Sequence, residues 1–419
     1  MAGAKVFISN IDPMEYLRIG TSYFKKVSRP LPSGDKVEML MPWSSECIKQ
    51  DHGRHFMSEI PRYDGFCLVP DHLKYQQVIG NFYNRYNPFF HKPTPGEPTT
   101  TLIFLNHIFG SQLNLGLDYL KILLLYPMQV LPILCLLSSE RNTGKTTFLN
   151  FMKALFGDNM TINSNDDFRS NFNAEWANKL IIGVDETFLD RKEDSEKIKS
   201  LSTSKYYKIE AKGQDRQEIE FFGKFILCSN NEDNFIIIDP GEIRYWVRRL
   251  PSLQQDNKNL LSELRADIPF FLHYLLERPF STHSVSRMWF RSDLLATPEL
   301  TRVKRYNRNK LEVEMAQLLL FVLDSRDRVE KICFSLSDIQ DWLVKKGFRN
   351  HDTSSVRSVL QNVWQLKPQS NSLTYLQYKL GTDGIVYEYT STGRYYTVLE
   401  KDVLKLNNLD EPDESFISS

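Results

Sequence analysis

The 419-residue sequence is poor in cysteine, and it has neither a net charge nor a long hydrophobic run. Its five cysteines stand far apart, and no two of them have C-x-x-C spacing. This usage is typical of a reducing compartment and excludes a disulfide framework and a cysteine-based zinc site. With 52 basic and 52 acidic side chains, the chain lacks an overall positive field, which excludes a histone-like nucleic-acid binder.

The most hydrophobic window, residues 122–137, is too short to span a bilayer and is broken by two prolines and a glutamine. The first residues, MAGAKVFISNIDP, contain no apolar core of signal-peptide length, so we expect a soluble protein of the cytoplasm. Four histidines could suggest a metal centre. Because no set of cysteine or carboxylate partners surrounds His52, His55, His72 and His91 at ligand spacing, we favour core or solvated histidines.

The most informative stretch that the sequence does contain is ILCLLSSERNTGKTTF at residues 133–148, an apolar run that ends in a polar loop. The run predicts a buried strand, and the residues after it match the P-loop pattern G-x-x-x-x-G-K-[ST], except that the first position is Ser139. In a P-loop, Gly144 would let the backbone approach a phosphate, Lys145 would reach the β- and γ-phosphates, and the hydroxyl of Thr146 would bind Mg²⁺.

We therefore predict a nucleoside triphosphate site at this loop. Serine makes the first turn of such a loop less easily than glycine does. A chance Gly-Lys-Thr between a strand and a helix is the alternative. The predicted nucleotide-binding residues are Ser139, Asn142, Thr143, Gly144, Lys145, Thr146 and Thr147.

A second buried strand is expected at residues 180–184, and two carboxylates, Asp185 and Glu186, follow it directly. In-line attack on a γ-phosphate needs a bound metal ion and a positioned water. Asp185 would hold Mg²⁺, directly or through water, together with Thr146, and Glu186 would orient and deprotonate the attacking water. Ordinary strands also end in Asp-Glu, but this pair follows Lys145 by 40 residues, which favours the catalytic interpretation.

Residues 206–222 alternate between apolar and polar side chains around a Gly-Gln-Asp turn, which predicts a β-hairpin with Lys212 and Arg216 flanking its tip. A solvated edge hairpin without a binding role is the other interpretation of this pattern. A third buried strand is expected at residues 225–228, and Asn230 follows it closely. An amide at this strand end can hydrogen-bond both the attacking water and the γ-phosphate.

Arg244 comes 14 residues after Asn230, and we expect it to follow the last strand of the core. An arginine at that place can act on the nucleotide of a neighbouring subunit, where such a residue raises the hydrolysis rate roughly 10³- to 10⁵-fold in other systems. Arg248 is the competing choice. For each of them, a surface arginine in an ordinary salt bridge is the alternative.

Together, the motifs at residues 139–147, 180–186 and 225–230 and Arg244 resemble those of superfamily 3 helicases in order and spacing. The resemblance covers about residues 95–255 and is strongest to the helicase portion of the poxvirus-type and phage-type primase-helicases. It implies an AAA+ core, a homo-oligomeric ring of six subunits, and movement from 3′ to 5′ on single-stranded DNA, with ATP and Mg²⁺ as cofactors.

The resemblance also implies roles for single residues. Catalysis would depend on Lys145, Asp185, Glu186, the sensor Asn230 and the finger Arg244. In such rings the hairpin before the third strand points into the pore, which implies DNA contacts at Lys212 first, then Lys208 and Lys199. The first 90 residues show no primase active site, so priming is not predicted, and a separate primase or another replication protein is a candidate partner.

The chain is expected to divide at a segment rich in proline and glycine, residues 91–98. The expected parts are an N-terminal α+β region at 1–92, a helical collar with the ATPase core at 93–280, a basic linker with a winged-helix-like domain at 281–405, and an acidic tail at 406–419. Helices are expected in the collar at 101–110 and 115–126, behind the P-loop at 147–156, and in a lid before residue 278.

The winged-helix prediction depends on two helices, residues 335–346 and 353–364, followed by strands at 385–389 and 394–399 that turn around residues 391–393. Arg357 would lie on the recognition helix and Arg394 at the wing, and the domain could bind DNA or dock a protein. Before it, five basic residues in nine positions form either a solvated connector or a phosphate-binding strip. These residues are Arg302, Lys304, Arg305, Arg308 and Lys310.

The function expected first is an ATP-dependent DNA helicase of phage or mobile-element replication, located in the bacterial host cytoplasm if a phage encodes it. The alternative is a P-loop ATPase switch or loader that binds nucleotide and partners without unwinding. A small-molecule kinase ranks last, because the hairpin and Arg244 would have no role in it.

Overall fold

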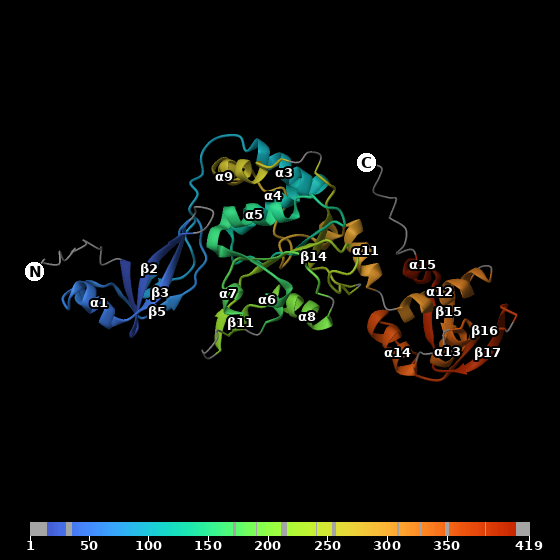
Figure 1. Cartoon of the computed structure of the whole chain (residues 1–419). Coiled ribbons are helices and arrows are strands. Elements are labelled where there is room, and N and C mark those ends of the chain that lie inside the picture. The colour runs from blue at the N-terminus through green and yellow to red at the C-terminus, as the bar shows by residue number, and fades with distance from the viewer. Residues whose placement is uncertain are drawn as a thin grey trace, which may run out of the picture.

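In the computed structural model, the residues described are 15–30, 36–170, 173–189, 191–210, 216–239, 241–253, 257–307, 310–326, 329–347, 352–381 and 383–407. They form an N-terminal, a central and a C-terminal part that follow one another in a row (Figure 1). Most of the predicted acidic tail, residues 408–419, lies outside these ranges. Within them, no helix is both long and apolar enough to span a membrane.

The central part is built on a five-stranded sheet in which all strands are parallel. In spatial order the strands are β14 (Tyr245–Arg249), β8 (Ile133–Leu137), β13 (Lys224–Ser229), β10 (Ile181–Val184) and β9 (Met160–Asn163). Every residue of β8, β10 and β13 is buried, as is usual for parallel strands covered on both faces. The predicted α/β class with a central parallel sheet is confirmed.

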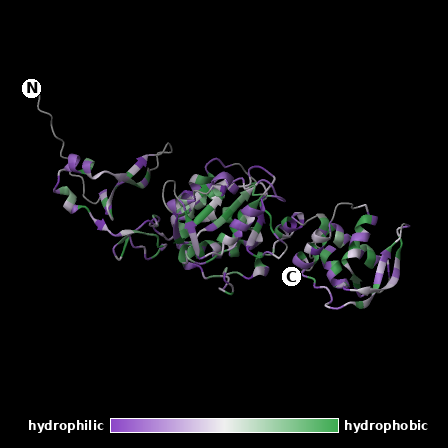
Figure 2. Ribbon diagram, turned by 90° about the horizontal axis from the view of Figure 1, so that it is seen from below, coloured by the Kyte–Doolittle hydropathy of each residue, from purple (hydrophilic) through white to green (hydrophobic). Residues whose placement is uncertain are grey.

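Helices cover both faces of this sheet, and hydrophobic residues are concentrated in its strands (Figure 2). One face packs against α3 (Thr99–Phe109), α4 (Leu113–Leu125), α5 (Lys145–Phe156) and α9 (Leu260–Glu277). The other face packs against α6 (Asn165–Arg169), α7 (Ala174–Ala177), α8 (Lys192–Leu201) and α11 (Pro298–Tyr306). The collar helices and the helix behind the P-loop thus form where the sequence predicts them.

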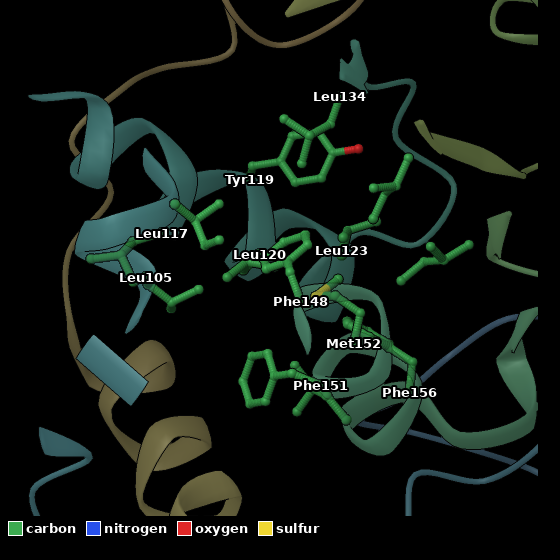
Figure 3. Packing of buried hydrophobic residues seen from close by; sticks show 14 of the residues in the cluster. Leu105, Leu117, Tyr119, Leu120, Leu123, Leu134, Phe148, Phe151, Met152 and Phe156 are labelled. Carbon is green, nitrogen blue, oxygen red and sulfur yellow. The ribbon is translucent and has the colours of Figure 1, made fainter. Parts of the chain in front are cut away.

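Figure 3 shows part of the first hydrophobic cluster, in which side chains of α5 lie against those of the collar helix α4. Phe148 and Phe151 of α5 are fully buried, as are Leu120 and Leu123 of α4. Burying a side chain of this size contributes about 1.5–3 kcal/mol. The helix that begins at the P-loop is therefore fixed at its base by the collar, which holds the loop in place.

Two strands of the sheet, β9 and β14, are not predicted from the sequence. β9 is an edge strand with mixed polarity, reached from α5 through a short 3₁₀ turn (Gly157–Asn159), and β14 ends in two arginines. Neither strand is therefore a continuous apolar run. Because β14 begins at Tyr245, the prediction that Arg244 follows the last core strand is wrong, and Arg244 directly precedes that strand.

The predicted hairpin is present as β11 (Tyr206–Ile209) and β12 (Gln217–Glu220), which pair antiparallel from Tyr206 opposite Glu220 to Ile209 opposite Gln217. The two strands form a sheet of their own, separate from the central one. The predicted DNA contact Lys212 lies outside the described residues, because the turn at 211–215 is not among them.

The described residues of the N-terminal part form two small sheets and two short helices. The first sheet has the order β3 (Lys36–Trp43), β2 (Ser22–Pro30), β1 (Tyr16–Ile19) and β4 (Arg62–Tyr63), and the second has the order β5 (Gly65–Cys67), β7 (Phe82–Asn84) and β6 (Val78–Ile79). The helices are α1 (Ser45–His52) and α2 (Phe56–Glu59). His72 is a core histidine, because its ring hydrogen-bonds the carbonyl of Leu124 and the hydroxyl of Tyr86.

The C-terminal part contains the two predicted helices. Its helical elements are α12 (Lys310–Asp324), α13 (Leu336–Lys345), α14 (Thr353–Ser358), a π-helical turn (Val359–Val363) and α15 (Glu400–Asn407). Its strands have the order β17 (Val386–Gly393), β16 (Leu373–Leu380), β15 (Lys331–Phe334) and β18 (Tyr396–Leu399).

The strand arrangement of this part differs from the predicted wing. β17 pairs antiparallel with β16, which the sequence does not predict, and β18 pairs with β15 instead. Residues 391–393 are therefore the end of a strand rather than a turn, and Arg394 is not at the tip of a hairpin. The reason is that β16 has an irregular burial pattern with exposed apolar residues, so its sequence lacks a clear alternation.

Candidate nucleotide-binding site

The predicted P-loop connects β8 to α5, and two of its residues have a left-handed backbone. Gly144 has φ +85° and Asn142 has φ +53°. A Cβ atom at Gly144 would lie 3.1 Å from the ring of Phe104, so both conformation and space favour glycine there. Ser139 has no positive φ, so the first position of the loop does not need the conformational freedom of glycine.

Lys145 begins α5 and is only 8% exposed. Its Nζ donates to the carbonyl of Ser138, at 2.9 Å, and to Oγ1 of Thr143, at 3.2 Å. Burial lowers the pKa of Lys145, although the nearby carboxylates of Asp185 and Glu232 oppose this shift. The ammonium group thus lies between the two ends of the loop, within the space that the loop encloses.

The two predicted metal ligands lie together. The hydroxyl of Thr146 donates to Oδ2 of Asp185 at 3.1 Å, although the two residues are 39 positions apart. Thr146 is exposed and Asp185 is partly exposed. Oxygen atoms of this kind are the ligands that Mg²⁺ prefers, usually with several waters retained.

Glu186 follows Asp185 and has φ +50°, which is uncommon for a residue other than glycine. Its carbonyl accepts a hydrogen bond from Nδ2 of Asn165, and the next residue, Thr187, donates through its N–H to the carbonyl of Cys228. These contacts hold the strained backbone in place. The carboxylate of Glu186 is exposed and has no hydrogen bond or ion pair within the described part of the chain.

Asn230 follows β13, which lies between β8 and β10 in the sheet. Its side chain is exposed, and the carbonyl of the preceding Ser229 accepts from the N–H of Ser138 at 3.1 Å. Because the strands are parallel, the residues after β8, β13 and β10 meet at one edge of the sheet. The P-loop, Asn230 and the carboxylates after β10 therefore occupy adjacent positions.

Glu232 is a site residue that the sequence analysis misses. Its Oε1 accepts from the N–H of Ser139 at 2.8 Å and from the hydroxyl of Ser139 at 3.0 Å. Arg249 and Arg302 each lie 3.0 Å from its Oε2. Burial raises the pKa of Glu232, but the hydrogen bonds from Ser139 and the charge of Arg249 outweigh burial, so the pKa is lowered overall.

The serine in the first P-loop position is thus held by a carboxylate. The signal in the sequence is an acidic residue two positions after Asn230, but nothing local links it to Ser139, which lies 93 positions away. Arg302, which belongs to the predicted basic strip, also pairs with Asp233 at 2.7 Å. Within the predicted strip, Arg302 is therefore an ion-paired residue of the structure and not a free phosphate ligand. Arg308 lies outside the described residues.

Arg244 and Arg248 lie at different places on the sheet. The carbonyl of Arg244 accepts from the N–H of Ile133 at the start of β8. Arg244 therefore lies where the strands of the sheet begin, which we call the amino edge, and the P-loop lies at the opposite edge, where the strands end. Its guanidinium pairs with Glu242 at 2.6 Å. Arg248 instead donates to Gln112, in a 3₁₀ turn of the collar (Gly110–Gln112), and is half-buried there. Burial lowers the pKa of Arg248.

The predicted DNA contacts also separate. Lys208 lies on β11 and is exposed. Lys199 lies in the last turn of α8, not on the hairpin, and pairs with Glu196 at 2.6 Å and with Asp239 at 2.7 Å. Two carboxylates therefore already satisfy the charge of Lys199.

A family model described as "Family of unknown function (DUF5906)" matches residues 136–249, which run from β8 to β14. No curated protein matches the sequence. Among solved structures, the apo C-terminal region (305–718) of NrS-1 aligns with 91% of this chain and 95% of its own, at TM-score 0.62 and 14% identity. An A-form apo structure of that region aligns with 93% of this chain and all of its own, at TM-score 0.60 and 15% identity.

The chain therefore shares its overall fold with the NrS-1 region, and at this identity the likeness shows the fold alone. A structure of JCV helicase aligns with 52% of this chain and 63% of its own, at 12% identity. Its TM-score of 0.30 is too low to bear on fold or function.

Proposed function

We propose that the chain is an ATP-hydrolysing DNA helicase of the superfamily 3 type that acts in phage or mobile-element replication, in the bacterial host cytoplasm if a phage encodes it. The observation that carries the proposal is the meeting of three motifs at one edge of a parallel sheet. Lys145 of the P-loop, Asp185 and Glu186 after β10, and Asn230 after β13 come from three adjacent strands.

The residues at this edge fit a nucleoside triphosphate with Mg²⁺. The first amides of α5 and the backbone at Gly144 would receive phosphate oxygens, and Lys145 would add a positive charge. Thr146 and Asp185 would hold the metal ion, because their oxygen atoms already lie 3.1 Å apart. When bound, Mg²⁺ neutralises negative charge on the phosphates and so makes the terminal phosphoryl group easier to attack.

Three side chains would then act on the attacking water and on the charge of the reacting phosphate. The carboxylate of Glu186, which has no partner in the described structure, would accept the proton of the water. The exposed amide of Asn230 would orient the same water, and Lys145 would stabilise the developing negative charge.

The hairpin and Arg244 support the second part of the proposal, a ring of six copies around single-stranded DNA. Arg244 lies at the sheet edge opposite its own P-loop, so it would act on the nucleotide of a neighbouring copy and not on its own. The hairpin of β11 and β12 would present Lys208 to the DNA phosphates. Lys212, which lies outside the described residues, is proposed as a further contact from the sequence pattern alone. Phosphate contacts of this kind make binding strongly salt-dependent and largely independent of sequence.

The test is the ATPase rate of the full chain with and without single-stranded DNA. We expect DNA to stimulate hydrolysis, and we expect Lys145→Ala and Glu186→Gln to lower the rate roughly 10²- to 10⁴-fold. Lys153→Ala is the matched control, because Lys153 lies further along α5 and pairs with Asp158. ATP binding with little hydrolysis, unaffected by DNA, would contradict the proposal and support a switch or loader instead.

A further inference from the structure

A pocket of about 460 Å³ lies beside Arg244, at the amino edge of the central sheet. The segment before β14 forms one side of the pocket, and the segment that includes α10 (Ser292–Leu295) forms the other. Its charged lining residues are Asp239, Glu242, Arg244 and Arg287. Ser286 and Ser292 also line the pocket, so they can add hydroxyl groups to its surface.

Three of the four charged lining residues have partners. Glu242 pairs with Arg244 at 2.6 Å, and Asp239 pairs with Lys199 at 2.7 Å. Arg287 is exposed, and its guanidinium makes no hydrogen bond or ion pair with any other described residue. The pocket therefore contains a positive charge that is available to an anion.

Hydrogen bonds hold the loop that carries Arg287. The N–H of Val285 donates to the carbonyl of Trp289 at 3.1 Å, and the hydroxyl of Ser286 donates to the carbonyl of Phe290 at 2.7 Å. The carbonyl of Arg287 itself accepts from Nε2 of Gln129, in the segment just before β8. The loop is thus attached to the amino edge of the sheet, where Arg244 also lies.

Trp289 at the end of this loop has φ +71°, a strained conformation for a bulky residue. Its ring stacks on Tyr126, with centroids 5.8 Å apart, and packs against Phe280 at 5.2 Å. Strain of this kind persists only where the surroundings enforce it, and it is concentrated at functional sites. The strained loop holds the backbone of Arg287 at the pocket.

We propose that Arg287 acts together with Arg244 on the triphosphate held by the P-loop of a neighbouring copy of this chain. The inference depends on the proposed function and adds a second residue that acts across the subunit interface. A parallel sheet places the pocket and the P-loop at opposite edges, so a copy cannot bring Arg287 to its own nucleotide. A head-to-tail contact, which closes into a ring, brings the amino edge of one copy to the nucleotide edge of the next.

The test uses full-length variants. Arg287→Ala should bind ATP like the wild type, because its own P-loop is intact, while kcat for hydrolysis falls roughly 10- to 100-fold, less than for Arg244→Ala. Arg287→Lys should recover part of the rate. Arg291→Ala is the matched control, since Arg291 pairs with Asp293 and does not line the pocket, so its rate should stay unchanged.

Mixed oligomers then decide whether Arg287 acts in trans. Arg287→Ala and Lys145→Ala chains, co-expressed with different tags and purified through both, should hydrolyse ATP faster than either variant alone. In such an oligomer a Lys145→Ala copy supplies Arg287 to the intact P-loop of an Arg287→Ala copy. Unchanged kcat in Arg287→Ala, or no recovery on mixing, would overturn the inference.

The same mixing with Arg244→Ala separates the two proposals. Recovery with Arg244→Ala but not with Arg287→Ala would refute only the role of Arg287. A wild-type chain without ATPase activity would refute the proposed function, and the role of Arg287 with it.

Discussion

Replacing Glu232 with alanine would remove the carboxylate that holds the first residue of the P-loop. This carboxylate accepts the N–H of Ser139 at 2.8 Å and its hydroxyl at 3.0 Å. A hydrogen bond to a charged group contributes about 1.5–3 kcal/mol. Because both donors can be hydrated in the variant, the two bonds together count for less than their separate values. We expect the free energy that favours the ordered conformation of the loop to fall by about 2–3 kcal/mol.

The ion pairs of Glu232 add little to this loss. The side chains of Arg249 and Arg302 are 51% and 47% exposed, so each pair is screened by solvent and contributes about 0–1 kcal/mol. The variant should therefore fold with nearly unchanged thermal stability and show its defect in nucleotide binding. At 1.4 kcal/mol for each factor of ten, the Kd for ATP should rise roughly 30- to 140-fold.

The assay is a titration of the full chain with a fluorescent ATP analogue, together with thermal unfolding. Asp233→Ala is the matched control, because Asp233 pairs with Arg302 but does not contact Ser139, and its Kd should remain that of the wild type. Glu232→Gln, which keeps an acceptor and loses the charge, should lie between the wild type and Glu232→Ala.

A double-mutant cycle identifies the contact itself. Ser139→Ala removes only the hydroxyl, so it should raise the Kd less than Glu232→Ala does, and combining the two changes should give less than the sum of their effects, by roughly 1 kcal/mol. Additive effects, an unchanged Kd in Glu232→Ala, or an equal loss in Asp233→Ala would show that Glu232 does not support the P-loop.

Two further predictions concern the hairpin and a buried lysine. Lys212→Ala should leave basal ATPase activity intact and stop unwinding of a forked DNA duplex. Lys199→Ala is the control and should unwind nearly normally, because Lys199 is already ion-paired with Glu196 and Asp239. Normal unwinding by Lys212→Ala would exclude the hairpin from DNA contact. Burial lowers the pKa of Lys224, which donates to the carbonyls of Pro127 and Phe222, to about 7. Between pH 7 and about 10.4, Lys224 is therefore protonated in the unfolded chain and neutral in the folded one. In that window the free energy of unfolding should rise by roughly 1.4 kcal/mol per pH unit. Below pH 7 the lysine is protonated in both states and contributes no slope. Urea unfolding at several pH values should show this slope in the wild type and not in Lys224→Met, and equal slopes in both would contradict the assignment.

The strands that the sequence predicts correctly are those buried on both faces. β8 and β10 are continuous apolar runs, and β13 contains one, because every residue in these strands is buried. β9 lies at the edge of the sheet, and β14 ends in two arginines, so periodicity alone could not identify them. For the same reason the place of Arg244 relative to the strands could not be derived from the sequence.

In the candidate site, predictable residues are those that belong to a local motif. Gly144, Lys145 and Asp185 each stand beside a buried strand or helix that can be recognised from the sequence, and the parallel sheet then brings them together. Glu232 belongs to the site through its hydrogen bond with Ser139, which is distant in the sequence. Arg287 lines a pocket that two separate segments of the chain form. No spacing rule connects residues of this kind before the fold is known.

The contact between Ser139 and Glu232 also bears on how chains of this fold can diverge. A glycine in place of the serine would remove the hydroxyl that donates to the acid, and an apolar residue in place of the acid would leave the serine hydroxyl without its acceptor. The two positions are therefore expected to be exchanged as a pair among relatives. A sequence pattern that requires glycine at the first position of the loop would not detect relatives that have serine there.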